Sequence, residues 1–216
     1  MLKILLILHI AAGTLAFIVA PVALATAKGG KAHRQWGMVY FWAMAFVAAS
    51  ALILALARPT LFLAFVAVFS FYLSFLGYRT LSGKKGEAYA LDWIGAIVAF
   101  AACLLFVYLA LFSPATIQGQ SIPGTVFGTV GLLASGRAIS SYIFKPADKM
   151  FWWYRHMGNM LGSYIAAWSA FSVNIISRYA GNHWWVWLWP SILGVPAIIV
   201  WIGYYRRRFE RKPGAV

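Results

Sequence analysis

Leu91–Phe112 reads LDWIGAIVAFAACLLFVYLALF, and Asp92 is the only charged residue in this run. An α-helix needs about 20 apolar residues to cross the roughly 30 Å of hydrocarbon in a bilayer, so this run is long enough to span a membrane. Six more runs of similar length and character fill most of the chain. The seven runs are Ile4–Ala27, Trp36–Ala57, Thr60–Leu81, Leu91–Phe112, Ile122–Phe144, Trp152–Ser177 and Trp184–Tyr205.

Composition agrees with a membrane protein. The 216 residues are 63% hydrophobic and 10% charged, whereas about a quarter of the residues of a soluble domain are charged. We therefore predict an all-α, polytopic membrane protein with a bundle of seven transmembrane helices. Residues 1–205 form the single membrane domain, and residues 206–216 form a basic tail. Ala25-Thr26-Ala27 is typical of a signal-peptide cleavage site, but the first run exceeds such a signal in length and we expect it to remain.

Positive charge is concentrated in alternate connections between the runs. If the first connection lies inside, the inner segments carry fourteen of the 18 lysines and arginines, the outer segments carry Lys3, Arg58 and Arg178, and Arg137 lies within a run. The fourteen are Lys28, Lys31, Arg34, Arg79, Lys84, Lys85, Lys145, Lys149, Arg155, Arg206, Arg207, Arg208, Arg211 and Lys212. This bias predicts an N-terminus outside and a C-terminus in the cytoplasm, with the protein in the cell inner membrane.

The net charge of +14 is explained by this topology. Because the charge lies along one membrane face, it indicates anionic lipid headgroups as partners and argues against nucleic acid. A membrane protein partner or a second copy of the chain is also compatible with the sequence.

Two functional classes lose support from the distribution of charged residues. All eight lysines lie outside the runs, which excludes a retinal Schiff base in the last helix. The four acids, Glu87, Asp92, Asp148 and Glu210, all map to the inner boundary. Ion-coupled transporters usually need a carboxylate or a broken polar helix near the midplane, so transport is weakened but not excluded.

The four histidines all lie near helix ends. His33 and His156 map to the inner boundary, and His9 and His183 map to the outer boundary. A b-type haem needs two imidazoles from facing helices at one depth, so each pair is a candidate set of haem-iron ligands. The alternative is that these are ordinary interfacial histidines. Tyr40 continues the helical face of His33.

Helix six carries a polar stripe, and helix five carries a membrane-embedded arginine. The stripe comprises His156, Asn159, Ser163, Ala167, Ala170 and Asn174. Helical spacing places these residues on one face, which we expect to face the bundle interior, either as packing contacts or as a cavity wall. Arg137 either extends to the inner headgroups or has a partner, for which Asp92 is the best candidate by depth. It is also a candidate for binding an anion or a haem propionate.

Several segments resemble a bacterial family of predicted multi-pass membrane proteins of unknown function. The resemblance rests on Lys28-Gly29-Gly30-x-x-His33-Arg34-x-x-Gly37-x-x-Tyr40, on Phe69-Ser70-x-Tyr72 with Gly77-Tyr78-Arg79, and on His156-Met157-x-x-Met160-x-x-Ser163-Tyr164. It covers about residues 5–174, implies a membrane protein, and draws attention to His33, Gly37, Tyr40 and His156.

A second resemblance is to the di-haem membrane cytochromes of the ascorbate-oxidising type. His9-Ile10-Ala11-Ala12-Gly13 and His33-Arg34-Gln35-Trp36-Gly37 are similar to the histidine-glycine helix starts of those proteins. This resemblance implies haem b and a redox function. Helices three to five of this chain contain no histidine, which departs from the pattern of those cytochromes.

Three classes of function therefore remain open. The first is a redox protein that binds b-type haem or a quinone at the boundary histidines. The second is a binding or transport module for a small solute or lipid, built on the helix-six stripe and Arg137. The third is a structural or accessory membrane subunit.

Overall fold

The computed structural model describes residues 1–58, 60–84, 86–181 and 183–211. Within them it has seven α-helices, one short 3-10 helix and no strand. The elements are α1 (Leu2–Ala25), α2 (Lys31–Ala57), α3 (Leu61–Arg79), α4 (Ala90–Phe112), η1 (Pro114–Ile117), α5 (Ser121–Ile143), α6 (Phe151–Ala180) and α7 (Trp184–Arg211). The all-helical prediction is therefore confirmed.

Six of the helices are long and apolar enough to cross a membrane, as expected of a multi-pass membrane protein. The exception is α5, whose 23 residues include Gly124, Gly128, Gly131 and Gly136 as well as several serines and threonines. Its length matches that of its neighbours, and its lower hydropathy follows from the small residues it uses to pack against them.

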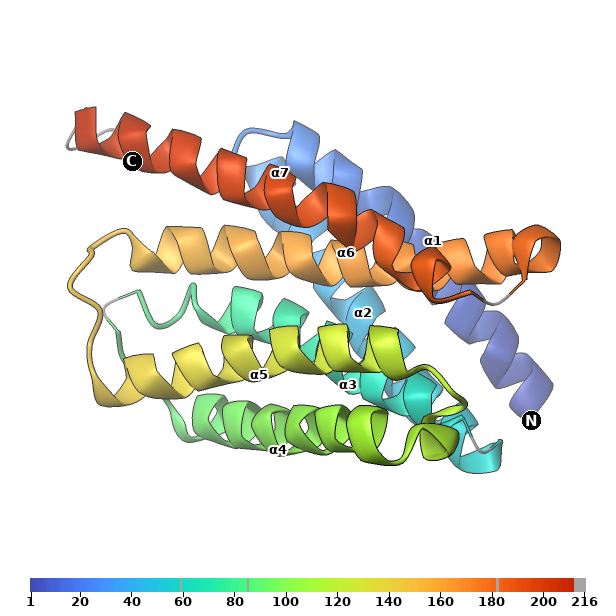
Figure 1. Ribbon diagram of the computed structural model, residues 1–216. Helices are drawn as coiled ribbons and strands as arrows, with labels where there is room; N and C mark the ends of the chain where they lie inside the picture. The colour runs from blue at the N-terminus through green and yellow to red at the C-terminus, as the bar shows by residue number, and fades with distance from the viewer. Residues whose placement is uncertain (59, 85, 182, 212–216) are drawn as a thin grey trace.

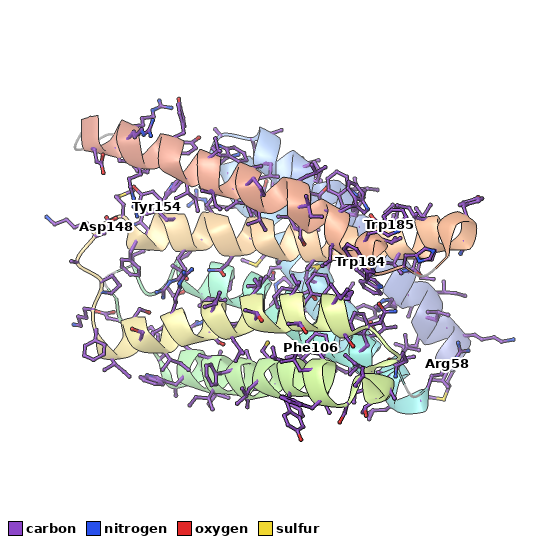
Figure 2. All side chains as sticks on the ribbon, viewed as in Figure 1. Arg58, Phe106, Asp148, Tyr154, Trp184 and Trp185 are labelled. Carbon is purple, nitrogen blue, oxygen red and sulfur yellow. The ribbon has the colours of Figure 1, made fainter. Side chains whose placement is uncertain are left out.

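Successive helices run in alternating directions (Figure 1). The α1–α2, α3–α4 and α5–α6 connections and the C-terminal end of α7 lie at one end of the bundle, which we call the basic end. The N-terminus and the other connections lie at the opposite end. Figure 2 shows Asp148 and Tyr154 at the basic end, and Arg58, Trp184 and Trp185 at the other.

The helix boundaries depart from those predicted most at the start of α2 and at the end of α7. α2 begins at Lys31, several residues before the predicted start at Trp36, so His33 lies in its first turn rather than before it. α7 continues to Arg211, so the start of the predicted tail is helical rather than separate from the membrane domain. Hydropathy marks where a run becomes apolar, whereas backbone hydrogen bonding continues into the polar residues beyond it.

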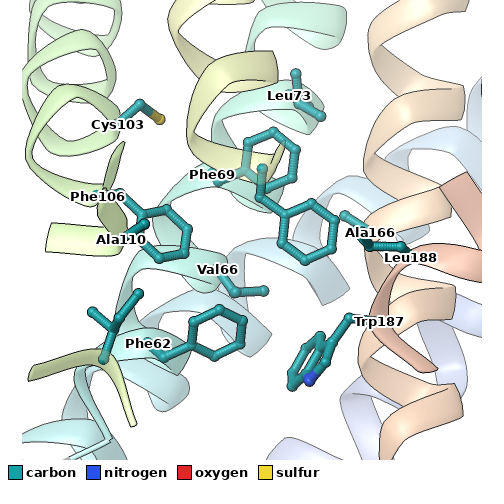
Figure 3. Packing of buried hydrophobic residues seen from close by; sticks show 12 residues of the cluster. Phe62, Val66, Phe69, Leu73, Cys103, Phe106, Ala110, Ala166, Trp187 and Leu188 are labelled. Carbon is teal, nitrogen blue, oxygen red and sulfur yellow. The ribbon is translucent and has the colours of Figure 1, made fainter. Parts of the chain in front are cut away.

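The main core is largely aromatic and is built from α3, α4 and α7, with single residues from η1, α5 and α6 (Figure 3). Phe62 and Phe106 are fully covered and meet edge to face, and the rings of Phe69 and Phe127 stack with their centroids 5.5 Å apart. α4 and α5 pack closely at Gly128, which has no side chain to separate them. A Cβ at this position would lie only 3.2 Å from the backbone oxygen of Cys103. This packing holds one side of the bundle together. A pocket lies on the other side, between α1, α2 and α6.

Candidate cofactor site between α1, α2 and α6

His33 and His156 meet at the basic end of the bundle. His33 lies in the first turn of α2 and His156 in the second turn of α6. Their ring centroids are 6.2 Å apart and their planes are inclined at 76°. The two inner histidines that the sequence singles out are thus neighbours in space, although 123 positions separate them in the chain.

Each imidazole is oriented by a backbone carbonyl at the end of another helix. His33 Nδ1 lies 2.9 Å from the carbonyl oxygen of Ala23, and His156 Nδ1 lies 2.9 Å from that of Gly77. Ala23 and Gly77 are among the last four residues of α1 and α3, whose carbonyls have no partner within their own helix. A carbonyl can only accept, so Nδ1 carries the proton in both rings. In the neutral imidazole, Nε2 then presents a lone pair.

A largely apolar pocket lies against both imidazoles, and its empty space of about 430 Å³ includes open space at its mouth. It is lined by Ala20, Ala23, Leu24, His33, Gly37, Tyr40, His156, Met160, Leu161 and Tyr164. Gly37 lies one turn after His33, and no atom lies within 4 Å of the position that a Cβ would take there. The pocket therefore reaches the α2 backbone itself.

A buried hydrogen bond closes the deep side of this pocket. The Tyr40 hydroxyl and the Ser163 hydroxyl are 2.5 Å apart, and the two residues are 2% and 0% exposed. Tyr40 comes seven positions after His33, and Ser163 seven positions after His156, so the bond lies about 10 Å farther along both helices. It joins α2 to α6 at that depth.

Positive charge lies beside the pocket at the basic end. The Lys28 amino group donates to the carbonyl oxygen of Leu24, a lining residue, and lies 5.9 Å from the centroid of the Trp201 ring. Partial burial lowers the pKa of Lys28, because it removes water from around the charged form.

The outer histidines have other neighbours. His9 Nδ1 lies 2.8 Å from the Ser50 hydroxyl oxygen, and that hydroxyl donates to the carbonyl of Phe46, so His9 is the donor. The His183 ring stacks against Trp185 with the centroids 6.5 Å apart. No contact in the described part of the chain joins His9 to His183, and the structure places the two inner histidines alone as a pair.

The polar stripe of helix six is only partly inward. Ser163 is buried, but Asn174 is exposed, and the Asn159 and Asn174 amides each donate to a carbonyl of α6 itself at 2.8 Å. The prediction that the whole stripe faces the interior is therefore wrong. Beyond Ser163, the buried positions are Ala166, Ser169 and Ser172, because the packing line on α6 advances by three residues rather than by alternating threes and fours.

The expected partnership of Arg137 with Asp92 is also wrong. Asp92 is held by Arg79, with Nε to Oδ1 at 2.6 Å and Nη2 to Oδ2 at 3.0 Å, and Oδ2 also accepts the Tyr89 amide at 2.9 Å. Arg137 is exposed on α5, and none of the described residues pairs with it. On α5 the level of Asp92 is that of Tyr142, whose ring meets Trp93 with the centroids 5.3 Å apart, whereas Arg137 lies five residues earlier, about 7.5 Å farther from the basic end. The sequence signal for Arg79 is its place opposite Asp92 across the short α3–α4 connection.

No protein-family model, curated protein or solved structure matches this chain. The two family resemblances seen in the sequence therefore remain predictions, and functional assignment rests on the geometry of the pocket.

Proposed function

We propose that this chain is a membrane cytochrome that holds a b-type haem between His33 and His156 and transfers electrons. The observation that carries the proposal is the pair of imidazoles, each fixed through Nδ1 and separated by 6.2 Å between ring centroids at an apolar pocket. An imidazole held by an Nδ1–H···O=C bond is the usual form of a metal-ligating histidine.

The spacing of the rings suits two axial ligands of one metal. With metal–nitrogen distances of about 2 Å, the two ligating nitrogens lie about 4 Å apart, and the ring centroids lie about 2 Å farther apart than the nitrogens. The observed centroid separation of 6.2 Å agrees with that sum. Inclined ring planes are compatible with ligation, because a metal does not fix the angle between the planes of its two imidazole ligands.

The number of available donors favours haem over a bare metal ion. Among the described residues, no group of three or more His, Cys, Asp and Glu side chains comes together. A protein-bound zinc ion generally needs three or four such ligands. A haem iron brings four equatorial nitrogens of its own and needs only the two imidazoles.

The pocket wall supports a flat, apolar ligand with acidic edges. Gly37 lets such a ligand approach the α2 backbone, and Leu24, Met160 and Leu161 supply apolar surface. Lys28 offers a cation for a propionate at the basic end. Imidazoles whose Nε2 atoms carry lone pairs are less suitable for a quinone, whose carbonyl oxygens require hydrogen-bond donors.

The proposal includes the membrane arrangement expected from the sequence. We place α5 across the bilayer with the other six helices, because its 23 residues extend about 34 Å. The basic end lies in the cytoplasm against anionic headgroups of the inner membrane, and the N-terminus lies outside.

An absorption spectrum tests the function directly. The protein, expressed with haem supplementation and purified in mild detergent, is expected to show a Soret band and the low-spin spectrum of six-coordinate iron. His33→Ala and His156→Ala are each expected to remove that low-spin spectrum, and the double variant should add little. His183→Ala is the matched control and should leave the spectrum unchanged. Absence of a Soret band, or a band that survives both inner replacements, would refute the assignment.

A further inference from the structure

A second pocket lies at the basic end, on the side of α3, α4 and α5. Its empty space of about 320 Å³ includes open space at its mouth, and its lining includes Arg79, Thr80, Asp92, Ser141, Tyr142 and Arg155. Arg155 and His156 are consecutive in α6, so their side chains leave the helix about 100° apart. Arg155 lines this second pocket, whereas His156 lines the first.

The two arginines in this pocket differ in their neighbours. Arg79 is neutralised by the two-point ion pair with Asp92. Arg155 is half-buried, and none of the described residues supplies it with a carboxylate or a hydrogen bond. Its guanidinium lies 5.4 Å from the centroid of the Phe151 ring and has Tyr72 and Tyr142 nearby. A partly buried guanidinium without a counter-ion is unfavourable, and an anion at this place would relieve it.

Hydrogen-bond donors converge on the same space. The Arg155 guanidinium offers five N–H groups, and Arg79 retains those that Asp92 does not use. The Tyr142 hydroxyl has no hydrogen-bond partner among the described residues. By contrast, the Thr80 and Ser141 hydroxyls donate to the carbonyls of Leu76 and Ala138. The free donors therefore belong mainly to the two arginines and Tyr142.

Further lysines flank the pocket. Lys84 follows the lining residue Gly83, and its amino group lies 4.3 Å from the centroid of the Trp152 ring. The Lys145 side chain approaches Gly86, another lining residue, to 3.7 Å from the position of a Cβ there. Glu87 also lines the pocket, but it is exposed and forms no ion pair with Arg155.

We propose that this second pocket binds a phosphate group, held by Arg155 and Tyr142 with support from Arg79. The planar fork of arginine matches two phosphate oxygens, and phosphates are the abundant anions at headgroup depth. The group belongs either to an anionic phospholipid or to free phosphate, and the experiment below distinguishes these two sources.

Thermal unfolding in neutral detergent provides the first arm. Inorganic phosphate is titrated against chloride at matched ionic strength, and the midpoint of unfolding is measured. In the second arm, native mass spectrometry counts bound phosphatidylglycerol, with phosphatidylcholine as the zwitterionic reference. A phosphate-dependent rise identifies free phosphate, whereas retention of phosphatidylglycerol alone identifies the lipid headgroup.

Arg155→Gln is the decisive variant, and Arg207→Gln is its control because Arg207 is an exposed arginine of α7 at the same end. Arg155→Gln is expected to weaken binding about tenfold or more, which corresponds to the loss of a charge-assisted hydrogen bond. Without ligand its unfolding midpoint should equal or exceed that of the native protein, because an unpaired charge has gone. Arg207→Gln should bind normally.

Two results would overturn the proposal. The first is equal ligand responses in native protein and Arg155→Gln. The second is that Arg155→Gln is less stable than the native protein without ligand and that no binding depends on Arg155. This result would mean that the guanidinium only stabilises the fold through its contacts with aromatic rings. If Arg155→Gln fails to fold, Arg155→Lys and Tyr142→Phe take its place. Both should fold and bind several-fold more weakly, and undiminished binding by both would likewise refute the site.

Discussion

A substitution at Gly37 can test ligand binding without disturbing the fold. The position lines the histidine pocket and has open space where a Cβ would lie. We predict that Gly37→Leu folds with unchanged or slightly higher thermal stability, because glycine is unfavourable within a helix by about 1 kcal/mol. The leucine side chain should fill the pocket and reduce haem occupancy, measured as the ratio of Soret to protein absorbance, by most of its value.

Gly203→Leu is the matched control for this change. Gly203 lies in α7 and also has nothing within 4 Å of its Cβ position, but it does not line the pocket. The two variants should share their effect on folding and differ in the ratio of absorbances. Equal haem content in both would place the ligand elsewhere.

The ion pair of Arg79 and Asp92 gives a prediction about stability. The Asp92 side chain is 7% exposed and that of Arg79 is 21% exposed. Arg79→Leu leaves a buried carboxylate without its counter-ion and should lower the free energy of unfolding by about 3 kcal/mol. Adding Asp92→Asn should restore part of that loss, so the double-mutant cycle for this pair should show clear coupling in denaturant titrations.

The same cycle with Arg137 in place of Arg79 should be additive. Arg137 is exposed and has no described contact with Asp92, and Arg137→Leu should leave the folded yield intact. Coupling between Arg137 and Asp92 would show that the two side chains meet in the membrane-embedded protein.

The difference between these two arginines shows what the sequence determines at the residue scale. His33 and His156 could be predicted to be neighbours in depth, because hydropathy and the charge of the connections indicate how far each residue lies from the membrane surface. Both lie at the basic end. Depth carries no information about direction around the bundle. Arg137 lies more than one helical turn from the level of Asp92, which is that of Tyr142 on α5, whereas the α3–α4 connection brings Arg79 and Asp92 together. The carbonyl groups that orient the two histidines could not be predicted from the sequence either, because these contacts depend on which helix ends meet.

At the scale of elements, α5 is held in the bundle by close packing of its glycines against α4 more than by the hydropathy of its side chains. A Cβ on Gly128 would lie 2.6 Å from the Val107 side chain and 3.2 Å from the Cys103 backbone oxygen. Gly128→Ala should therefore push α5 away from α4 and lower stability by about 1–3 kcal/mol, as overpacking does. Thermal unfolding in detergent measures the effect.

Gly136→Ala tests whether that loss is specific to the α4–α5 contact. Gly136 lies in the same helix, and its nearest neighbour across the interface is a Phe100 ring atom at an ordinary 3.7 Å. We expect Gly136→Ala to be neutral or slightly stabilising. A similar loss in both variants would mean that α5 responds to alanine generally.

Helix existence could be predicted from the sequence, and helix ends could not. Every apolar run corresponds to a helix. The start of α2 and the end of α7 lie beyond their runs because Lys31 and Arg211 are polar but remain hydrogen-bonded within the helix. Similarly, the inward face of α6 could not be read from polar spacing, since asparagine can satisfy its amide on its own helix.

For the whole molecule, reporter fusions test the orientation. We expect alkaline phosphatase fused after Gln120 to be active, because the α4–α5 connection lies at the end that we propose to be outside, and a fusion after Gly29 to be inactive. A cytoplasm-active reporter, such as green fluorescent protein, should show the reverse pattern. Phosphatase activity after Gly29 would invert the topology.

The hydrogen bond between Tyr40 and Ser163 limits what the molecule as a whole is able to do. It stands between the histidine pair and the distal half of the bundle, where aromatic packing is tight. A single haem seated above this bond would exchange electrons with partners on the cytoplasmic leaflet alone. The protein would then act as a one-sided relay, and the membrane potential would neither drive nor oppose its turnover.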